Sequence, residues 1–197
     1  KSKGVVRFAL IAYKDFSDQD TIKSYPFTTD LVMAKSYVGR MAASGGGDEP
    51  EAVATALYEA TQMKFNPSAK KLCVLIGDAP PHGMGSNGDN YPNGDPNGND
   101  WIALADEIHK MGVTCYTLVC DRAKDNHIFT LFMDTLAQKT NGRCILLSNA
   151  EKLPDFLINS TLEELEIESV VSQYLKNLSK EDKEKLTAEE ISQLVGE

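Results

Sequence analysis

Two loops of this chain place carboxylates beside glycines, a combination typical of divalent-cation sites. The first loop spans residues 44–51 (SGGGDEPE) and the second spans residues 77–83 (GDAPPHG). Asp and Glu supply the oxygen ligands that Mg²⁺ and Ca²⁺ prefer, and glycine lets the backbone approach an ion closely. We therefore predict that Asp48 and Asp78 are metal ligands.

Each of these acidic residues also has a structural explanation. Asp48 precedes a predicted helix led by Pro50 and could cap it, so capping and metal contact both stay open. Glu51 is better explained as an acidic residue in the first turn of the same helix, where it interacts with the positive end of the helix dipole, than as a metal ligand. We place Glu51 at the rim of the site. Asp78 directly follows an apolar strand, where it could order the turn through its own backbone.

Asp15 and His82 are two further candidates near the predicted site. Asp15 follows another predicted strand and is placed at the rim with Glu51, with a salt bridge to Lys14 or Arg7 as the alternative. His82 stands in a Pro-His-Gly turn, where it could serve in metal binding or proton transfer, although we expect a hydrogen bond to the backbone instead. No functional role is assigned to His82.

Alternating strands and helices must position these side chains. Helices of roughly 10 to 15 residues that alternate with strands indicate an α/β fold. Its sheet is expected to be mostly parallel, Rossmann-like and flanked by helices. Ligands of such sheets bind beyond the carboxyl ends of the strands, so Asp15, Asp78 and Asp121 should share one rim. Strands are predicted at residues 5–12, 24–28, 71–76, 113–119 and 144–147, and helices at 31–41, 51–63, 101–111, 128–140 and from about 150.

Two segments fall outside this alternation. Residues 83–100 are rich in Gly, Asn, Asp and Pro and are predicted to form a solvated surface loop. Residues 161–197 are rich in Leu, Glu and Lys and are predicted to form an acidic helical extension or linker. Packing against the domain and docking to another domain both remain open for this tail.

Composition limits the classes of partner. The 197 residues carry a formal net charge of −9, which disfavours nucleic acid and anionic membranes as partners. No apolar run approaches the ~18 to 20 residues of a membrane span, so we expect a soluble, cytoplasmic protein without membrane insertion. The four cysteines lie in apolar, strand-like runs and are expected to be buried thiols: Cys73, Cys115, Cys120 and Cys144.

Several motifs together resemble one protein family, the von Willebrand factor type A domains. Within it, the chain is most similar to the type A domains attached to alpha-type protein kinases. The resemblance implies a type A domain over residues 1–160 and a metal-ion-dependent adhesion site in which Asp48 and Asp78 are ligands. The motifs are FALIAYKD (8–15), PFTTD (26–30), SGGGDEPEAVATAL (44–57), IGDAPPHG (76–83) and YPNGDPNG (91–98).

One part of the family pattern has no counterpart here. The sequence contains no Asp-x-Ser-x-Ser loop, and it starts where the second strand of the family would be. We therefore expect a type A fold without its first strand and helix, with unpaired strand edges as a consequence. Mg²⁺, or Ca²⁺ or Mn²⁺, is expected to bind only if the missing first loop is supplied.

The resemblance implies protein–protein interaction rather than catalysis. We expect a regulatory or targeting part of a larger alpha-kinase-like protein, whose protein partner offers a carboxylate to the metal. The chain has no P-loop, Gly-x-Ser-x-Gly elbow or His-Arg-Asp loop, so any kinase activity would lie in a domain outside it. A structural subunit with a vestigial metal site is the alternative, and a metal-dependent enzyme is a third class.

Overall fold

The computed structural model describes residues 5–42, 44–147 and 159. Contacts divide the chain into two units, Lys1–Leu146 and Leu147–Glu197. The first unit contains every strand and helix discussed below, except for Leu147, the last residue of the final strand. The helix predicted from about residue 150 and the tail at 161–197 lie outside the described residues.

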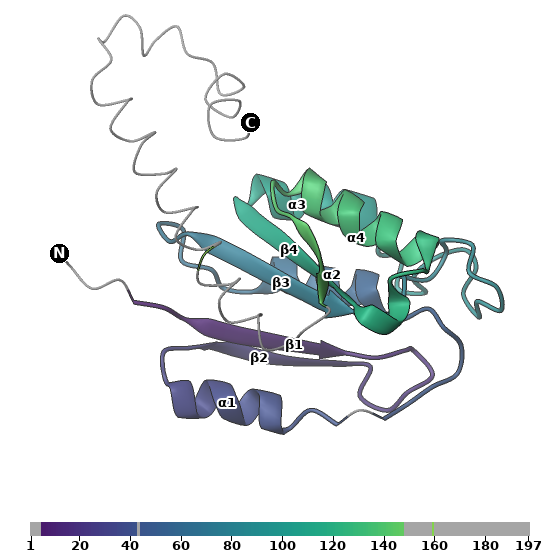
Figure 1. Ribbon diagram of the computed structural model, residues 1–197. Helices are drawn as coiled ribbons and strands as arrows, with labels where there is room; N and C mark the ends of the chain where they lie inside the picture. The colour runs from purple at the N-terminus through teal and green to yellow at the C-terminus, as the bar shows by residue number, and fades with distance from the viewer. Residues whose placement is uncertain (1–4, 43, 148–158, 160–197) are drawn as a thin grey trace, which may run out of the picture. The chain divides into compact units, whose positions relative to one another are not determined.

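Strands and helices alternate through the first unit as the sequence predicts, which confirms the α/β class (Figure 1). Apart from the start of β1, which lies three residues later than predicted, the boundaries fall within one or two residues of the prediction. The elements are β1 (Phe8–Tyr13), β2 (Ile22–Thr28), α1 (Leu31–Gly39), α2 (Val53–Gln62), β3 (Lys71–Gly77), α3 (Trp101–Lys110), β4 (Val113–Cys120), η1 (Asp121–Ala123), α4 (His127–Lys139) and β5 (Cys144–Leu147).

The strands form two sheets. One has the order β3-β4-β5, and β3 pairs with β4 in parallel from Lys71 opposite Val113 to Gly77 opposite Val119. The other contains β1 and β2, which pair antiparallel. The parallel sheet is the Rossmann-like part of the fold, and its strands end at the predicted site.

An unpaired edge of β1 and one of β3 remain within the described part of the chain. The two strands point the same way in Figure 1 and belong to different sheets. They are connected near their carboxyl ends, where the Tyr13 hydroxyl donates to the Ile76 carbonyl at 3.3 Å. Ile76 keeps 43% of its surface exposed, although it lies in one of the most apolar runs of the chain.

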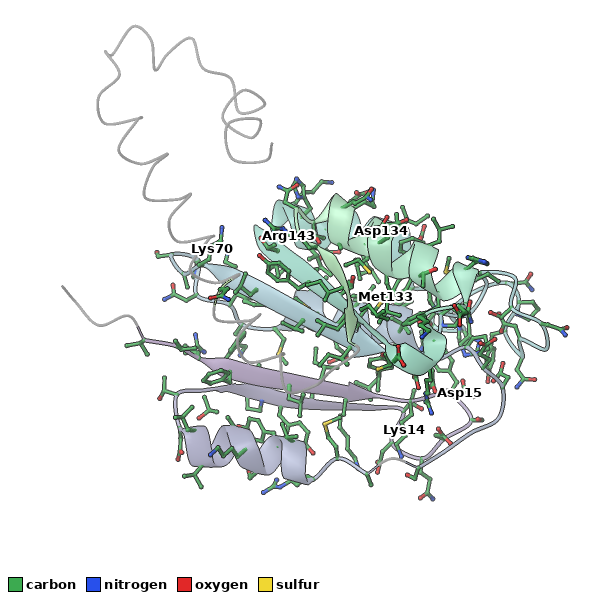
Figure 2. All side chains as sticks on the ribbon, in the orientation of Figure 1. Lys14, Asp15, Lys70, Met133, Asp134 and Arg143 are labelled. Carbon is green, nitrogen blue, oxygen red and sulfur yellow. The ribbon has the colours of Figure 1, made fainter. Side chains whose placement is uncertain are left out.

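Packing around β4 forms the core. Helices α3 and α4 contact β4, α2 contacts α3 and β1, and α1 contacts β1 and β2. Met133 and Asp134 are neighbours on α4, with Met133 fully buried and Asp134 exposed (Figure 2). All four cysteines are free thiols on strands, but only Cys115 is buried as predicted, and Cys73, Cys120 and Cys144 are half-buried.

Helix starts depend on different contacts. Asp30, Asp100 and Asn126 cap α1, α3 and α4 by accepting hydrogen bonds from backbone N–H groups. Helix α2 has Ala52 at its N-cap and receives no side-chain cap. The capping role considered for Asp48 is therefore wrong.

The predicted start of α2 at Glu51 is also wrong, because backbone contacts hold the preceding residues outside the helix. The Glu51 N–H donates to the Pro80 carbonyl at 3.0 Å, and the Ala52 N–H donates to the Lys14 carbonyl at 3.2 Å. Glu51 consequently lies between the loops after β1 and β3 rather than in the first helical turn.

No helix in the described ranges is both long and apolar enough to cross a membrane.

Two leucines of α4 provide a matched test of this core. Leu136 is completely buried, whereas Leu131 is 63% exposed. We expect Leu136→Ala to lower the free energy of unfolding by about 2–5 kcal/mol through lost burial and the cavity left behind. Leu131→Ala should change it by less than about 0.5 kcal/mol. Urea unfolding measures both, and similar losses would contradict this placement of α4.

Candidate metal centre

Asp15, just beyond β1, is buried, with only 1% of its surface exposed. Its Oδ1 accepts the Phe16 N–H at 2.6 Å, and its Oδ2 accepts the Ser17 hydroxyl at 2.7 Å. The alternative salt bridges are wrong, because Lys14 donates to the Ser44 hydroxyl and the Arg7 guanidinium lies over the Phe27 ring.

His82 lies at the centre of the site, and the predicted backbone hydrogen bond is wrong. Its Nε2 lies 2.9 Å from Asp15 Oδ1, and its Nδ1 lies 2.7 Å from Asp89 Oδ1. The side chains of all three residues are at most 2% exposed. Since ionised carboxylates only accept hydrogen bonds, both ring nitrogens donate, and the ring is a buried imidazolium.

The pKa values of these groups follow from this arrangement. Burial alone lowers the pKa of His82, but hydrogen bonds to Asp89 and Asp15 and their charges outweigh it and raise the pKa above 6.5. For the carboxyl groups of Asp15 and Asp89, burial has the opposite effect and by itself raises the pKa. Their hydrogen bonds, including those to His82, outweigh it, and both pKa values lie below 3.8.

Part of the loop at residues 83–100 packs into the site, so the prediction of a solvated loop is wrong for this part. Asp89 Oδ2 accepts the Gly83 N–H, and its Oδ1 accepts the Tyr91 N–H, both at 2.8 Å. Gly83 has a φ of +82°, and a Cβ there would press against Gly94. Further along, the Thr55 hydroxyl donates to Asp95.

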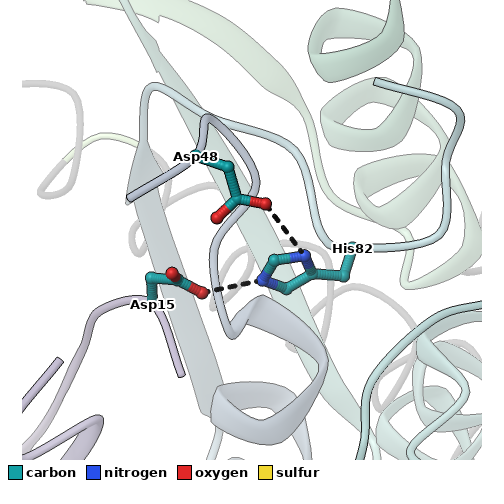
Figure 3. A group of neighbouring side chains, drawn as sticks. All are labelled: Asp15, Asp48 and His82. Atoms are coloured by element: carbon teal, nitrogen blue, oxygen red, sulfur yellow. Dashed lines mark hydrogen bonds and ion pairs between the residues drawn. The ribbon is translucent and has the colours of Figure 1, made fainter. Parts of the chain in front are cut away.

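Asp48 connects the first glycine loop to this cluster. Its side chain is only 6% exposed, and its Oδ2 accepts the Asn90 N–H at 2.7 Å. That same Oδ2 lies 3.9 Å from His82 Nδ1 (Figure 3). Its Oδ1 is buried and has no hydrogen-bond partner in the part of the chain that is described.

Glu51 supplies a second buried oxygen of the same kind. Its Oε2 finds no hydrogen-bond partner among the described residues. Burial, then the nearby charges of Asp15 and Asp18, raise the pKa of Glu51 from 4.5 to about 7. Near neutral pH this carboxyl is therefore poised between its protonated and ionised forms.

Asp48, Glu51 and Asp78 line one cleft of about 350 Å³. The structure thus brings both predicted metal ligands and Glu51 to a common cavity. Asp15 and Asp121, which were expected on the same rim as Asp78, are not among the residues that line this cleft. Asp121, which follows β4, is exposed and pairs with Lys124. The remaining lining residues are Glu49, Ala79, Arg122, Ala123 and Asn126.

Asp15, Asp48 and His82 form a group whose potential ligand atoms all lie within 4.8 Å of one another (Figure 3). Both His82 nitrogens already contact carboxylates, so coordination by His82 would break one of those hydrogen bonds. The unsatisfied oxygens of Asp48 and Glu51 have no such competing contact. Because buried carboxylate oxygens require compensation, these two fit a cation.

Sequence reasoning assigned no role in the site to three contributors: His82, Asp89 and Arg122. The turn containing His82 was noticed, but its partner Asp89 lies seven residues later in a segment without periodicity. Arg122 contacts Asp78 from the turn that follows β4. The one available signal was that this turn should meet the same sheet edge as Asp78.

Comparison with known proteins shows partial similarities. The chain is 32% identical over 114 residues to the alpha-protein kinase vwkA of Dictyostelium discoideum, which covers 56% of this chain and 18% of the kinase. It is 26% identical over 149 residues to an ariadne-like RING finger protein of Acanthamoeba polyphaga mimivirus, covering 73% of this chain and 14% of that protein. The chain therefore matches less than a fifth of either relative.

No known family model matches the chain, so the von Willebrand type A assignment stays a prediction. Similarity to an alpha-protein kinase is confirmed for part of the chain. Among solved structures, a membrane spanning protein from Vibrio fischeri aligns with a TM-score of 0.33 and 18% identity, covering 81% of this chain and 76% of that one.

Removing the His82 ring should destabilise the fold, because Asp15 and Asp89 would remain buried without their shared cation. We expect His82→Ala to lower the free energy of unfolding by about 2–4 kcal/mol at pH 6. His127→Ala, at an exposed position on α4, should change it by less than about 0.5 kcal/mol. Urea unfolding provides the comparison, and equal losses would contradict the central position of His82.

The stabilisation that these charges provide should depend on pH. The contribution of His82 is complete below pH 6.5 and is lost as pH rises through its raised folded pKa. Those of Asp15 and Asp89 are complete above pH 3.8 and are lost as pH falls through their lowered folded pKa values. The difference between the unchanged chain and His82→Ala should therefore be largest between these limits. An NMR titration showing His82 neutral at pH 6 would contradict this.

Proposed function

We propose that this chain is a non-catalytic protein-interaction domain that binds a divalent cation in its acidic cleft. The observation that carries the proposal is the pair of buried, unsatisfied oxygens, Asp48 Oδ1 and Glu51 Oε2, in a cleft shared with Asp78. Burying a carboxylate without compensation is costly, and a bound cation supplies that compensation.

Asp48 and Asp78 would hold the cation, and Glu51 would contribute a third carboxylate from the rim. All-oxygen ligands favour Mg²⁺, with Ca²⁺ and Mn²⁺ as the other candidates. When bound, the cation supplies a positive charge that can attract an acidic side chain. Asp15 acts behind the cleft, where it holds His82 and, through the loop after β3, the position of Asp48.

A protein partner with an exposed carboxylate suits this cleft. Mg²⁺ takes six oxygen ligands, more than Asp48, Asp78 and Glu51 provide if each binds through one oxygen. A first loop supplied from outside this sequence would provide further ligands, and an acidic side chain of the partner would complete the coordination. A partner without the carboxylate would leave the cation incompletely coordinated, which gives selectivity.

The two relatives support a role inside a larger protein. One is named an alpha-protein kinase and the other a RING finger protein, and this chain matches only a small part of each. We propose that the chain is a regulatory or targeting domain of an alpha-kinase-like protein, with kinase activity in another domain.

One observation favours the alternative of a structural module with a vestigial site. Asp78 already has a counter-ion, because the Arg122 guanidinium contacts its carboxylate. A structural module would keep its partners in EDTA, whereas a cation-dependent interaction domain would lose them.

Calorimetric titration with Mg²⁺ tests the cation site directly. We expect saturable binding that weakens at least about tenfold in Asp48→Asn and in Asp78→Asn, because each loses a charged ligand. Asp134→Asn is the matched control, since Asp134 is exposed on α4. Measurable heat that is equal in all four proteins would overturn the proposal.

Glu51→Gln separates cation binding from stability. Because the folded chain binds more protons than the unfolded chain between pH 4.5 and about 7, ionisation of Glu51 lowers stability as pH rises through this range. In EDTA at pH 8, we expect Glu51→Gln to raise the free energy of unfolding by about 1–2 kcal/mol, after allowance for solvent screening. Below pH 4.5 it should change little.

The same variant should gain less stability from Mg²⁺ than the unchanged chain. Thermal unfolding with and without Mg²⁺ measures this difference. A variant that is destabilised in EDTA and stabilised normally by Mg²⁺ would show that Glu51 has a structural contact instead.

A further inference from the structure

Arg122 has an unusual position in the acidic cleft. It belongs to η1, the short turn after β4, and its guanidinium pairs with the Asp78 carboxylate. The Arg122 side chain is 82% exposed and that of Asp78 is 27% exposed, so the ion pair lies at the mouth of the cleft. Of the described residues that line the cleft, Arg122 is the one with a cationic side chain.

Charge compensation in the cleft is therefore uneven. Asp78 has a counter-ion, whereas Asp48 Oδ1 and Glu51 Oε2 are buried without a hydrogen-bond partner in the described structure. Asn126 donates to Glu49 Oε1 at 2.7 Å, which satisfies that fourth acidic residue. A cation held jointly by Asp48, Glu51 and Asp78 must share Asp78 with Arg122 or displace it.

We propose that Arg122 is an internal counter-ion that competes with the divalent cation for Asp78 and leaves Asp78 when the cation binds. This inference rests on the proposed cation site and adds a residue that sets its affinity. An exposed ion pair is weak, so a cation can break it at small cost. Because Arg122 is mostly exposed, its guanidinium can move into solvent without loss of packing.

Removing Arg122 should strengthen cation binding for two reasons that act in the same direction. Asp78 no longer has a competing partner, and a positive charge beside the bound cation is lost. We expect Arg122→Gln to bind Mg²⁺ roughly 3- to 10-fold more tightly than the unchanged chain. By thermodynamic reciprocity, Mg²⁺ should also weaken the contact between Arg122 and Asp78.

Lys124→Gln provides the matched control. Lys124 lies two residues beyond Arg122, carries the same charge and pairs with Asp121, and it does not line the cleft. Its substitution removes the long-range repulsion but leaves the Asp78 contact intact. We expect less than about a twofold change in Mg²⁺ affinity, because solvent screens this more distant charge.

The experiment is calorimetric Mg²⁺ titration of the 197-residue chain and of its Arg122→Gln, Lys124→Gln and Asp48→Asn variants. NMR of the Arg122 Nε–Hε group adds a direct readout, since its resonance should shift on saturation with Mg²⁺. Tighter binding in Arg122→Gln alone, or binding that first becomes measurable in that variant, supports the proposal.

Two outcomes distinguish failure of the Arg122 proposal from failure of the cation site. Equal or weaker binding in Arg122→Gln, with binding still lost in Asp48→Asn, overturns the role of Arg122 and leaves the cation site standing. Absence of Mg²⁺ heat in both the unchanged chain and Arg122→Gln, with both folded, overturns the cation site itself.

Discussion

A single buried imidazolium, His82 between Asp15 and Asp89, is the interaction on which the arrangement of the loops depends. Asp15 follows β1, His82 follows β3, and Asp89 lies in the long loop beyond it. Hydrogen bonds that join two charged groups are stronger than neutral ones, and low local polarity strengthens them further. The rings of Phe16 and Tyr91, with centroids 5.4 and 5.0 Å from that of His82, pack around it.

The cleft beside this cluster differs in how its carboxylates are compensated. In the cluster, one proton on His82 compensates two carboxylates, and the remaining lone pairs accept backbone or hydroxyl donors. In the cleft, Asp48 and Glu51 each keep a buried oxygen without such a donor, whereas Asp78 pairs with Arg122. The hydrogen bonds of the cluster are satisfied, whereas the cleft leaves two carboxylate oxygens for the proposed cation. Asp48 belongs to both.

Sequence patterns predicted the fold better than they predicted the site. Apolar runs such as Val113–Cys120 and the amphipathic α4 identify buried elements. The two glycine-containing acidic loops and the family resemblance paired Asp48 with Asp78, and both residues line one cleft. The contact between His82 and Asp89 could not be predicted, because it depends on the path of an irregular loop. Likewise, the backbone contacts of Glu51 with a distant loop displaced it from its expected helical turn.

The unpaired edges of β1 and β3 in the described part of the chain offer backbone groups for pairing with strands of other molecules. Both strands are strongly apolar, FALIAY and KLCVLIG, and Lys71 at the start of β3 is the one charged residue within them. Natural sheets discourage intermolecular pairing with charges, prolines or bulges along their edges, and these two edges have few such features. Concentrated solutions of the chain would therefore be prone to strand-mediated aggregation, which an added complementary strand would suppress.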